Sequence, residues 1–348
     1  MSQLLVNGRF LTQGMTGVQR FALEITRALA AQASVQVLAP STAPDAPPLA
    51  IRRVGRLSGQ AWEQFELPRH AAGGVLLNLG NTAPLARRRQ LVVIHDTATF
   101  AHPDSYGWRF RTWYRWLQRG LVRRGACLAT VSAFARDGIA RHLGVDPAAV
   151  AVIGEGAEHI RRTPADAGLP ARLGLLRPYV LAVGSLAAHK NLAALGATAA
   201  LLAARAMDLV ITGDLDARVF GAAALPQPAR YVGRVDDAGL RALYEGAAAF
   251  VFPSRHEGFG LPAVEAMACG CPVIAARAGA LPEICGDAAL FADPLDAADI
   301  ARAIARVLDD PACAARLRHA GLARAAGHTW PAAAARLAAS LAAGDKTA

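Results

Sequence analysis

Short apolar runs alternate with amphipathic segments along most of the chain. The apolar runs predict buried β-strands at 3–6, 35–39, 74–77, 91–95, 127–131, 179–183, 208–212, 250–252 and 289–292. Apolar residues at helical spacing predict helices between these strands, at 18–31, 133–143, 192–204 and 237–246. Strands that alternate with helices are typical of α/β domains built on parallel sheets.

The stretch 250–276, with the sequence FVFPSRHEGFGLPAVEAMACGCPVIAA, predicts a strand, a loop, a helix and a second strand. Gly260 gives the loop a free backbone dihedral, and Pro262 suits the first turn of a helix. The helix would then begin with the unpaired backbone amides of Phe259, Gly260 and Leu261. Unpaired amides at the positive end of a helix dipole bind phosphate well.

Two carboxylates bracket this helix start. Glu257 precedes it in the loop, and Glu265 lies one turn into the helix. Either glutamate alone is explained as a solvated side chain or as a complement to the helix dipole. Together they suit neutral diols, because carboxylates are good acceptors for sugar hydroxyl groups. The stretch therefore indicates a nucleotide-sugar site.

The string HEGFGLPAVEAMACGCPVIA resembles the signature of retaining GT-B glycosyltransferases (glycosyltransferase family 4), including their E-x7-E element. The resemblance implies an α/β fold of two Rossmann-like domains that face each other across a cleft. It also implies that Glu265 holds the ribose diol of a nucleotide sugar, and that Glu257 touches the transferred sugar.

A chain of 348 residues is long for one core, so two domains are expected. We place the acceptor domain at 1–160 and the donor domain at 178–329. The Pro- and Arg-bearing segment 161–177 has little periodicity and is interpreted as a linker. The resemblance implies that a C-terminal helix within 330–348 completes the first domain.

In the first half, Gly17 lies in a glycine-bearing loop after the first strand, at the place of the family's loop that faces the donor. His95 and Asp96 end a central strand, where α/β sheets bind ligands, although a lone histidine is more often structural. The HD pair is followed by His102 and Pro103, a pattern similar to bacterial mannosyltransferases of the family. That similarity places His95 beside the transferred sugar, with Asp96 as its orienting or structural companion.

In the second half, the turn GSLAAHKN follows the strand at 179–183. Lys190 would act there as a point charge against a diphosphate. Ser185 stands in the same donor-facing turn, where family members commonly carry a basic residue. Asp214 and Asp216 form a D-x-D pattern, which we interpret as a turn, because GT-B enzymes generally need no metal.

The turn at 153–159, IGEGAEH, departs from the asparagine–glycine pair of many family members, and its role stays open. The five cysteines show no paired spacing, so neither a disulfide framework nor a zinc site is expected. The sequence shows no signal peptide and no membrane span, and a cytoplasmic protein is expected.

The formal net charge of +10 favours anionic partners without choosing among them. The segment 108–124 predicts a helix with Phe110, Trp113, Tyr114, Leu117 and Leu121 on one face. Arginines 111, 115, 119 and 123 form the other face, together with Trp108 and Trp116. Exposed indoles among arginines suit an anionic membrane surface, although a solvated basic face is the simpler alternative.

The expected function is retaining transfer of a sugar, mannose from GDP-mannose, onto a lipid-linked or oligosaccharide acceptor in lipopolysaccharide or exopolysaccharide biosynthesis. The resemblance implies front-face attack, with the donor phosphate taking the acceptor proton, and no cofactor or essential metal. One alternative is a UDP- or dTDP-linked donor. Another is a basic nucleic-acid binder, which no nucleic-acid motif supports.

Overall fold

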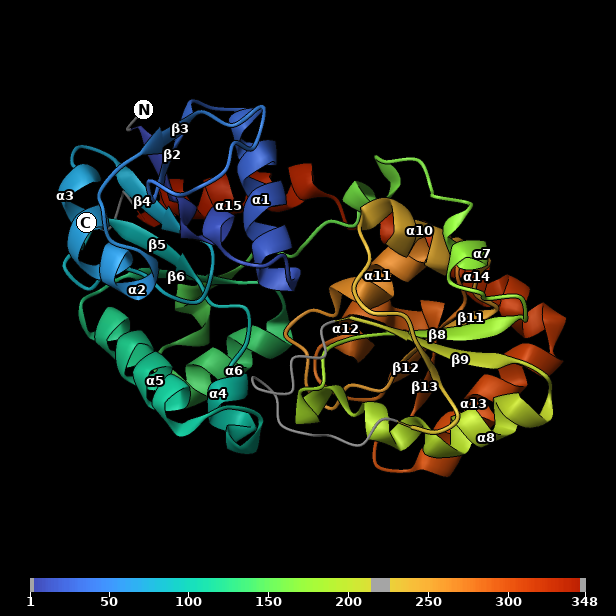
Figure 1. Cartoon of the computed structure of the whole chain (residues 1–348). Helices are drawn as coiled ribbons and strands as arrows, with labels where there is room; N and C mark the ends of the chain where they lie inside the picture. Colours follow the sequence, from blue (N-terminus) through green and yellow to red (C-terminus); the bar gives the residue numbers. More distant parts are fainter. Residues whose placement is uncertain (1–2, 214–225, 345–348) are drawn as a thin grey trace. The chain divides into compact units, whose positions relative to one another are not determined.

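The computed structural model describes residues 3–213 and 226–344, which form two compact units. The first unit contains Met1–Ala101, Gly107–Glu155 and Trp330–Ala348, and the second contains His102–Tyr106 and Gly156–Thr329. Each unit has its own parallel sheet with helices on it (Figure 1). Two α/β units are what the alternation of apolar runs and amphipathic segments predicts.

The first unit is built on a seven-stranded parallel sheet with the order β3-β2-β1-β4-β5-β6-β7. Its inner strands are buried almost throughout, as expected for strands covered on both faces. The strands are β1 (Leu4–Asn7), β2 (Val35–Ala39), β3 (Ile51–Arg53), β4 (Val75–Asn78), β5 (Gln90–Val93), β6 (Cys127–Thr130) and β7 (Val150–Val152). In register, Leu4 of β1 pairs with Val35 on one side and Val75 on the other.

The helices of the first unit are α1 (Gly17–Ala30), α2 (Gly59–Ala61), α3 (Leu67–His70), α4 (Ala98–Ala101), α5 (Trp108–Arg123), α6 (Ala133–Leu143) and α15 (Trp330–Gly344). The C-terminal helix α15 packs on α1, where the rings of Trp330 and Phe21 lie 5.9 Å apart, both fully buried. The last helix of the chain therefore belongs to the first unit.

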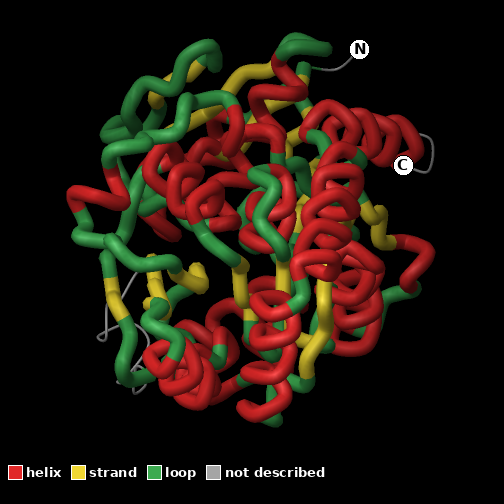
Figure 2. Tube along the Cα trace, turned by 90° about the vertical axis from the view of Figure 1, so that its right-hand side faces the viewer, coloured by secondary structure: helices red, strands yellow, loops and turns green. Residues whose placement is uncertain are grey.

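The second unit is built on a six-stranded parallel sheet with the order β10-β9-β8-β11-β12-β13. Its strands are β8 (Tyr179–Val183), β9 (Asp208–Thr212), β10 (Arg230–Tyr231), β11 (Ala249–Phe252), β12 (Val273–Ala276) and β13 (Ala289–Ala292). Its helices are α7 (Leu169–Arg172), α8 (Gly196–Ala204), α10 (Asp237–Gly246), α11 (Leu261–Ala268), α12 (Leu281–Cys285), α13 (Ala297–Asp309) and α14 (Pro311–Ala326). Figure 2 shows strands lying among helices in a view turned by 90°.

The segment 161–177, predicted as a linker, belongs to the second unit. It contains the short helix α7, and its backbone is tied to α10: the Asp166 amide donates to the Ala238 carbonyl at 3.0 Å. Arg241 of α10 donates to the carbonyls of Arg161 and Thr163, each at 3.0 Å. These hydrogen bonds join residues far apart in sequence, so local periodicity does not reveal them.

No helix within the described ranges, 3–213 and 226–344, combines the length and the apolar character needed to cross a membrane.

Candidate active site

The loop and helix at the carboxyl end of β11 have the geometry that the 250–276 stretch predicts. Helix α11 starts at Leu261, after Gly260 with a φ of +98°, a left-handed conformation that favours glycine. Within the described part of the chain, no atom accepts a hydrogen bond from the amides of Phe259, Gly260 or Leu261. The predicted set of unpaired amides is therefore present at this helix start.

The loop before α11 is held in place by its neighbours. The Arg255 amide donates to the His189 carbonyl at 2.8 Å, and the Ala280 amide donates to the Glu257 carbonyl at 3.0 Å. Gly279 has a φ of +60°, and a Cβ there would lie 2.6 Å from the Glu257 backbone nitrogen. Only glycine permits this close approach, so the chain behind Glu257 is fixed by backbone packing.

Lys190 and Glu257 meet in this unit. Lys190 Nζ donates to Glu257 Oε1 at 2.8 Å, and the ammonium group lies 5.6 Å from the centre of the Phe252 ring. Both side chains are mostly buried, with exposures of 22% for lysine and 11% for glutamate. Two residues predicted on separate grounds to contact a donor are thus joined directly.

The turn that carries Lys190 differs from its predicted form. The expected helix at 192–204 begins only at Gly196, as α8, and Lys190 ends a short 3-10 turn, Ala188–Lys190. Asn191 follows with a φ of 58°, and its side-chain amide donates to the carbonyls of Pro253, at 3.1 Å, and Pro294, at 2.8 Å. Ser185 is half-buried in the preceding turn, and its Oγ lies 3.5 Å from the Ala187 amide nitrogen.

Glu265 lies on α11 and is only 6% exposed. His159 Nε2 lies 2.9 Å from its Oε1 atom, and the Tyr244 hydroxyl donates to its Oε2 atom at 3.2 Å. Burial, and then the adjacent Glu265 carboxylate, raise the pKa of Tyr244 well above its usual value. Tyr244 is therefore a neutral hydrogen-bond donor to this carboxylate. The sequence did not identify either partner of Glu265.

His95 lies in the first unit and is buried, with 5% of its surface exposed. Its Nε2 atom lies 2.9 Å from the Leu79 carbonyl oxygen, and its Nδ1 atom lies 3.5 Å from Glu155 Oε1. The ring packs edge-on against Phe21, with the ring centres 4.6 Å apart. Both ring nitrogens therefore face acceptors within this unit.

The predicted companion of His95, Asp96, instead caps the next turn: its carboxylate accepts from the Ala98 amide at 2.8 Å. The acid that faces the imidazole is Glu155, from the turn at 153–159. That turn's departure from the family pattern is the only sequence signal that could have drawn attention to Glu155. Gly17 begins α1, and open space surrounds the position of a Cβ there.

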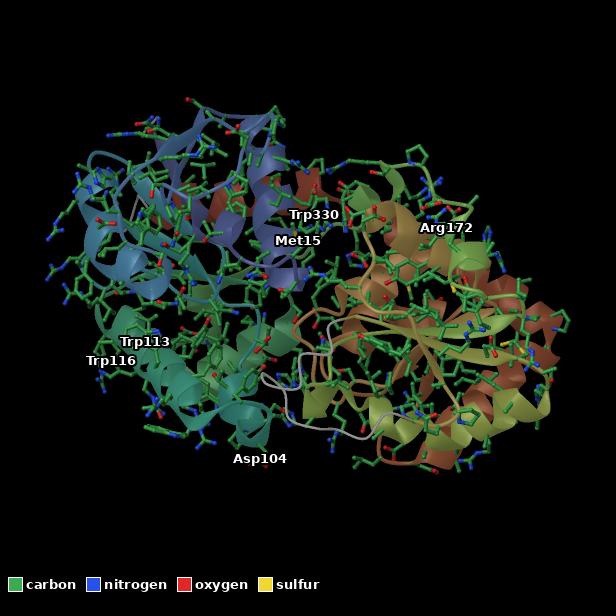
Figure 3. The ribbon with its side chains drawn as sticks, viewed as in Figure 1. Met15, Asp104, Trp113, Trp116, Arg172 and Trp330 are labelled. Carbon is green, nitrogen blue, oxygen red and sulfur yellow. The ribbon has the colours of Figure 1, made fainter. Side chains whose placement is uncertain are left out.

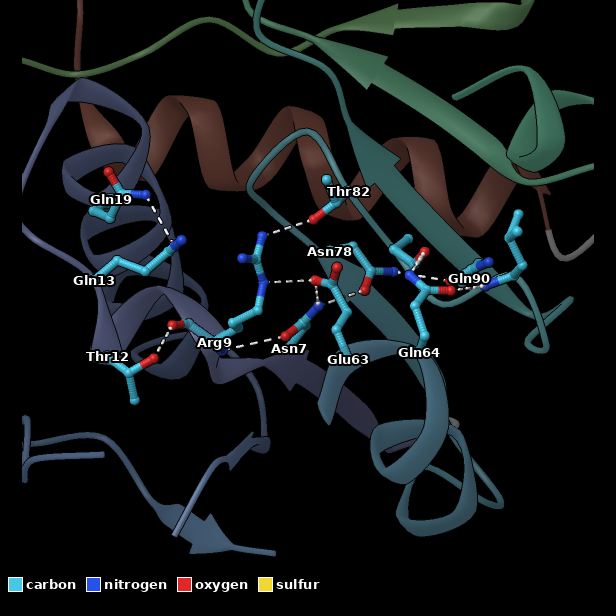
Figure 4. A network of polar contacts seen from close by, with 12 residues as sticks. Asn7, Arg9, Thr12, Gln13, Gln19, Glu63, Gln64, Asn78, Thr82 and Gln90 are labelled. Carbon is cyan, nitrogen blue, oxygen red and sulfur yellow. Dashed lines mark hydrogen bonds and ion pairs between the residues drawn. The ribbon is translucent and has the colours of Figure 1, made fainter. Parts of the chain in front are cut away.

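A buried polar network lies at the carboxyl ends of β1 and β4 in the first unit (Figure 4). Glu63 Oε1 accepts from Arg9 Nε at 3.1 Å and from Asn7 Nδ2 at 2.7 Å. Arg9 also donates to Thr82 Oγ1 at 2.8 Å. Glu63 is 1% exposed and lies on a π-helical segment, Trp62–Glu66. The network ties the first loop of the chain to this segment.

Among the described residues, no group of three or more His, Cys, Asp or Glu side chains is arranged to hold a metal ion. Asp214 and Asp216 lie outside the described residues.

The basic helix α5 is partly as predicted. Trp108 is 66% exposed and Trp116 is 55% exposed, so both indoles face solvent. Trp116 is labelled in Figure 3. Phe110, predicted on the same face as Leu117 and Leu121, is 44% exposed. It stacks on Tyr114, with the ring centres 4.1 Å apart. Arg115 was predicted on the free basic face, but its Nε donates to the Thr99 carbonyl at 2.9 Å. The exposed stripe is therefore Trp108, Thr112, Trp116, Arg119 and Arg123.

Two family models match the chain, one on each half: "Glycosyltransferase Family 4" on residues 15–161 and "Glycosyl transferases group 1" on residues 177–310. O-antigen chain mannosyltransferase B of Escherichia coli is 30% identical over 268 residues, which are 71% of this chain and 68% of that protein. O-antigen chain mannosyltransferase RfbU of Salmonella typhimurium is 28% identical over 239 residues, 64% of each chain.

Solved structures share the fold along the whole chain. Sucrose-phosphate synthase from Thermosynechococcus elongatus superposes with a TM-score of 0.76 at 21% identity, over 99% of both chains. Anabaena Alr3699/HepE in complex with UDP-glucose gives a TM-score of 0.76 at 17% identity, over 99% of this chain and 100% of that chain. The chain thus has the GT-B fold of two parallel α/β sheets, and it belongs to glycosyltransferase family 4.

Proposed function

We propose that this glycosyltransferase moves mannose from GDP-mannose, with retention, onto a lipid-linked or oligosaccharide acceptor during assembly of a bacterial surface polysaccharide. Relatives named as O-antigen mannosyltransferases support the sugar and the pathway. The HD pair at His95, followed by His102 and Pro103, points in the same direction. The alternative is a UDP- or dTDP-linked donor, and the experiment below distinguishes it from GDP-mannose.

The arrangement of Lys190, Glu257 and Glu265 around the start of α11 carries the proposal. Lys190 and the amides of Phe259, Gly260 and Leu261 would bind the diphosphate, since a cation and helix-start amides both attract phosphate. Glu265 would accept from the ribose diol and Glu257 from the transferred sugar.

The proposed site has three further members, Ser185, Gly17 and His95. Ser185 lines the Lys190 turn, and Gly17 lets the first loop of the chain approach the donor.

In the reaction, the bond between the anomeric carbon and the diphosphate breaks, and the acceptor oxygen forms the new bond on the same face. The acceptor proton passes to the leaving diphosphate. His95 would contact the sugar, and the enzyme's contribution is positioning and charge stabilisation.

The proposed chemistry needs no metal ion. A leaving diphosphate requires positive charge, which Lys190 and the α11 amides would supply without a divalent cation. No organic cofactor is needed either, because the nucleotide sugar is itself the activated substrate.

For the acceptor, we propose peripheral contact with an anionic membrane through α5. Its exposed stripe combines two indoles with arginines, and indoles and arginines both favour the interface of an anionic bilayer. A lipid-linked acceptor would be met at such a surface. No nucleic-acid partner is proposed.

Nucleoside diphosphate binding tests the donor assignment directly. The melting temperature would be measured with GDP, UDP and dTDP at equal concentrations, for the wild type and for Glu265→Ala. A ligand present at a hundred times its Kd adds about 2.7 kcal/mol of stability, which is a shift of several degrees. We expect a shift with GDP in the wild type and a much smaller one in the variant.

A second assay then uses GDP-mannose as the donor. When no acceptor is present, activity is measured as slow hydrolysis of the donor. A shift with UDP or dTDP and none with GDP would overturn the donor assignment while leaving the glycosyltransferase site in place. Equal shifts in the wild type and Glu265→Ala would show that the site itself is misplaced.

A further inference from the structure

The turn 153–159 joins β7 to a short 3-10 helix, Glu158–Arg161, and the boundary between the two units falls within it, after Glu155. Ile153 and Ala157 are fully buried. The Ile153 amide donates to the Thr130 carbonyl at 2.8 Å, and the Ala157 amide donates to the His328 carbonyl at 3.0 Å. This turn is therefore anchored in both units, rather than being a loose connection.

A side chain of this turn forms an acid–histidine pair in each unit. Glu155 faces Nδ1 of His95 in the first unit, at 3.5 Å. His159 faces Oε1 of Glu265 in the second unit, at 2.9 Å. The two side chains are four positions apart. Each forms an acid–histidine pair with a residue that the proposed function places at the substrate, His95 in the first unit and Glu265 in the second.

The second pair is deeply buried. The side chain of His159 is 2% exposed and that of Glu265 is 8% exposed. An ionised carboxylate at such a depth is costly unless hydrogen-bond donors surround it. His159 Nε2 and the Tyr244 hydroxyl supply one donor to each oxygen.

With these two donors bound, the Glu265 carboxylate can still accept further hydrogen bonds. An ionised carboxylate has about four lone-pair sites, so one bond to each oxygen leaves about one further site on each. Two free sites on neighbouring oxygens match the two hydroxyl groups of a vicinal diol. The donors also limit rotation of the carboxylate, which fixes the direction in which those sites point.

We propose that His159 is a positioning residue of the donor site, which together with Tyr244 holds the Glu265 carboxylate in one orientation for a vicinal diol. This inference rests on the proposed function, in which Glu265 binds the ribose of the donor. His159 itself touches no substrate. It acts on the nucleotide through Glu265 alone.

The test uses GDP and UDP as probes in calorimetry on the full chain. His159→Leu removes the donor, and we expect roughly tenfold weaker binding of the nucleoside diphosphate, the size of one lost hydrogen bond to a charged group. His159→Gln places an amide nitrogen near the position of Nε2 and should recover most of the affinity. With the nucleotide sugar, the KM of His159→Leu should rise roughly tenfold while kcat changes by less than about threefold.

A matched pair of tyrosine variants checks the second donor. Tyr244→Phe removes the hydroxyl that bonds to Glu265, and it should weaken nucleotide binding several-fold. Tyr179→Phe removes another buried tyrosine hydroxyl of the same unit, which donates to the Leu243 carbonyl at 2.8 Å. Tyr179→Phe should leave nucleotide affinity unchanged, and an equal loss in both variants would contradict the proposal.

A double-mutant cycle separates positioning from a general structural role. In a Glu265→Ala background, His159→Leu should change nucleotide affinity by less than about twofold. A loss of the same size in both backgrounds would overturn the inference. If His159→Leu does not fold, His159→Asn carries the comparison, because its shorter amide is polar but does not reach Glu265.

These measurements distinguish a wrong donor site from a wrong role for His159. If Glu265→Ala binds nucleotide as the wild type does, the donor site of the proposed function is wrong. If Glu265→Ala loses affinity while folded His159→Leu and His159→Asn keep it, the donor site stands and the role of His159 is refuted.

Discussion

The Lys190 ammonium group donates to Glu257 Oε1 at 2.8 Å, although the two residues are 67 positions apart. One comes from the turn after β8 and the other from the loop after β11, two strands that are neighbours in the sheet. In this arrangement Glu257 neutralises the charge that a diphosphate would use. A bound diphosphate must therefore compete with Glu257 for Lys190.

Lys190→Ala should weaken nucleoside diphosphate binding by about 1–3 kcal/mol, the usual cost of a lost charged hydrogen bond. Glu257→Gln should bind the nucleotide as tightly as the wild type or more tightly, because it frees Lys190, while sugar transfer falls. Calorimetry and a transfer assay measure the two effects. Arg306→Ala, on the exposed side of α13, is the control and should change neither. Weaker nucleotide binding by Glu257→Gln would contradict this account.

His95→Ala should leave nucleotide affinity unchanged and lower transfer by about 10- to 100-fold, since misplacing a reacting group costs rates of that order. Glu155→Gln should lower transfer less, because it alters the partner of His95 Nδ1 and leaves the imidazole itself in place. Asp96→Asn should have a smaller effect on transfer than either, since Asp96 caps the turn at Ala98. A transfer assay ranks the three variants, and a larger loss in Asp96→Asn than in Glu155→Gln would restore Asp96 as the companion of His95.

The buried pair of Arg9 and Glu63 should be a large contributor to the stability of the first unit. Arg9→Met leaves the Glu63 carboxylate, 1% exposed, without its cation, and such a loss costs about 3–5 kcal/mol. Arg53→Met removes an exposed partner of Asp45 and should cost less than about 1 kcal/mol. All five tryptophans lie in the first unit, so denaturant unfolding followed by tryptophan fluorescence reports on this unit. Equal losses in the two variants would mean that the network is not a main stabilising element.

Transfer should survive a chelator. Asp214 and Asp216 are interpreted as turn residues, and the positive charge for the leaving diphosphate is assigned to Lys190 and the α11 amides. Activity would be measured with and without excess EDTA, and the nucleotide affinity of the wild type measured alongside it. Loss of transfer that manganese or magnesium restores would refute the metal-free assignment.

The sequence predicted the helix start at α11 well, because every signal for it is local. Gly260 and Pro262 lie at the start of the helix, and the apolar spacing follows directly after them. The flanking apolar runs form β11 and β12. The order of strands within each sheet depends on pairing between distant segments, so these local signals did not predict it.

The partners of the site residues could not be predicted in the same way. Glu265 and His159 are 106 positions apart, and Glu257 and Lys190 are 67 apart, so each pair exists only once the sheet is assembled. Helical periodicity likewise places a residue on a face without saying what covers that face. For this reason Arg115, which binds the Thr99 carbonyl, was predicted as free.

The last prediction is that the protein binds anionic vesicles through the exposed stripe of α5. Each arginine near such a surface contributes about 1 kcal/mol, within a Debye length of roughly 10 Å, so binding should weaken as salt is raised. Trp108 and Trp116 should add anchoring at the interface that salt does not screen. Cosedimentation should therefore show binding to vesicles with anionic lipid and little binding to neutral ones.

Two sets of variants separate the contributions of charge and indole. Arg119→Glu with Arg123→Glu should abolish vesicle binding, while Trp108→Ser with Trp116→Ser should weaken it and leave its salt dependence intact. Arg306→Glu with Arg318→Glu changes the net charge equally, on exposed positions of α13 and α14, and serves as the control. Arg115 is left unchanged in every variant, because its bond to Thr99 belongs to the fold. If the control pair loses binding as fully as the α5 pair, the attraction comes from the net charge of the protein and not from this helix.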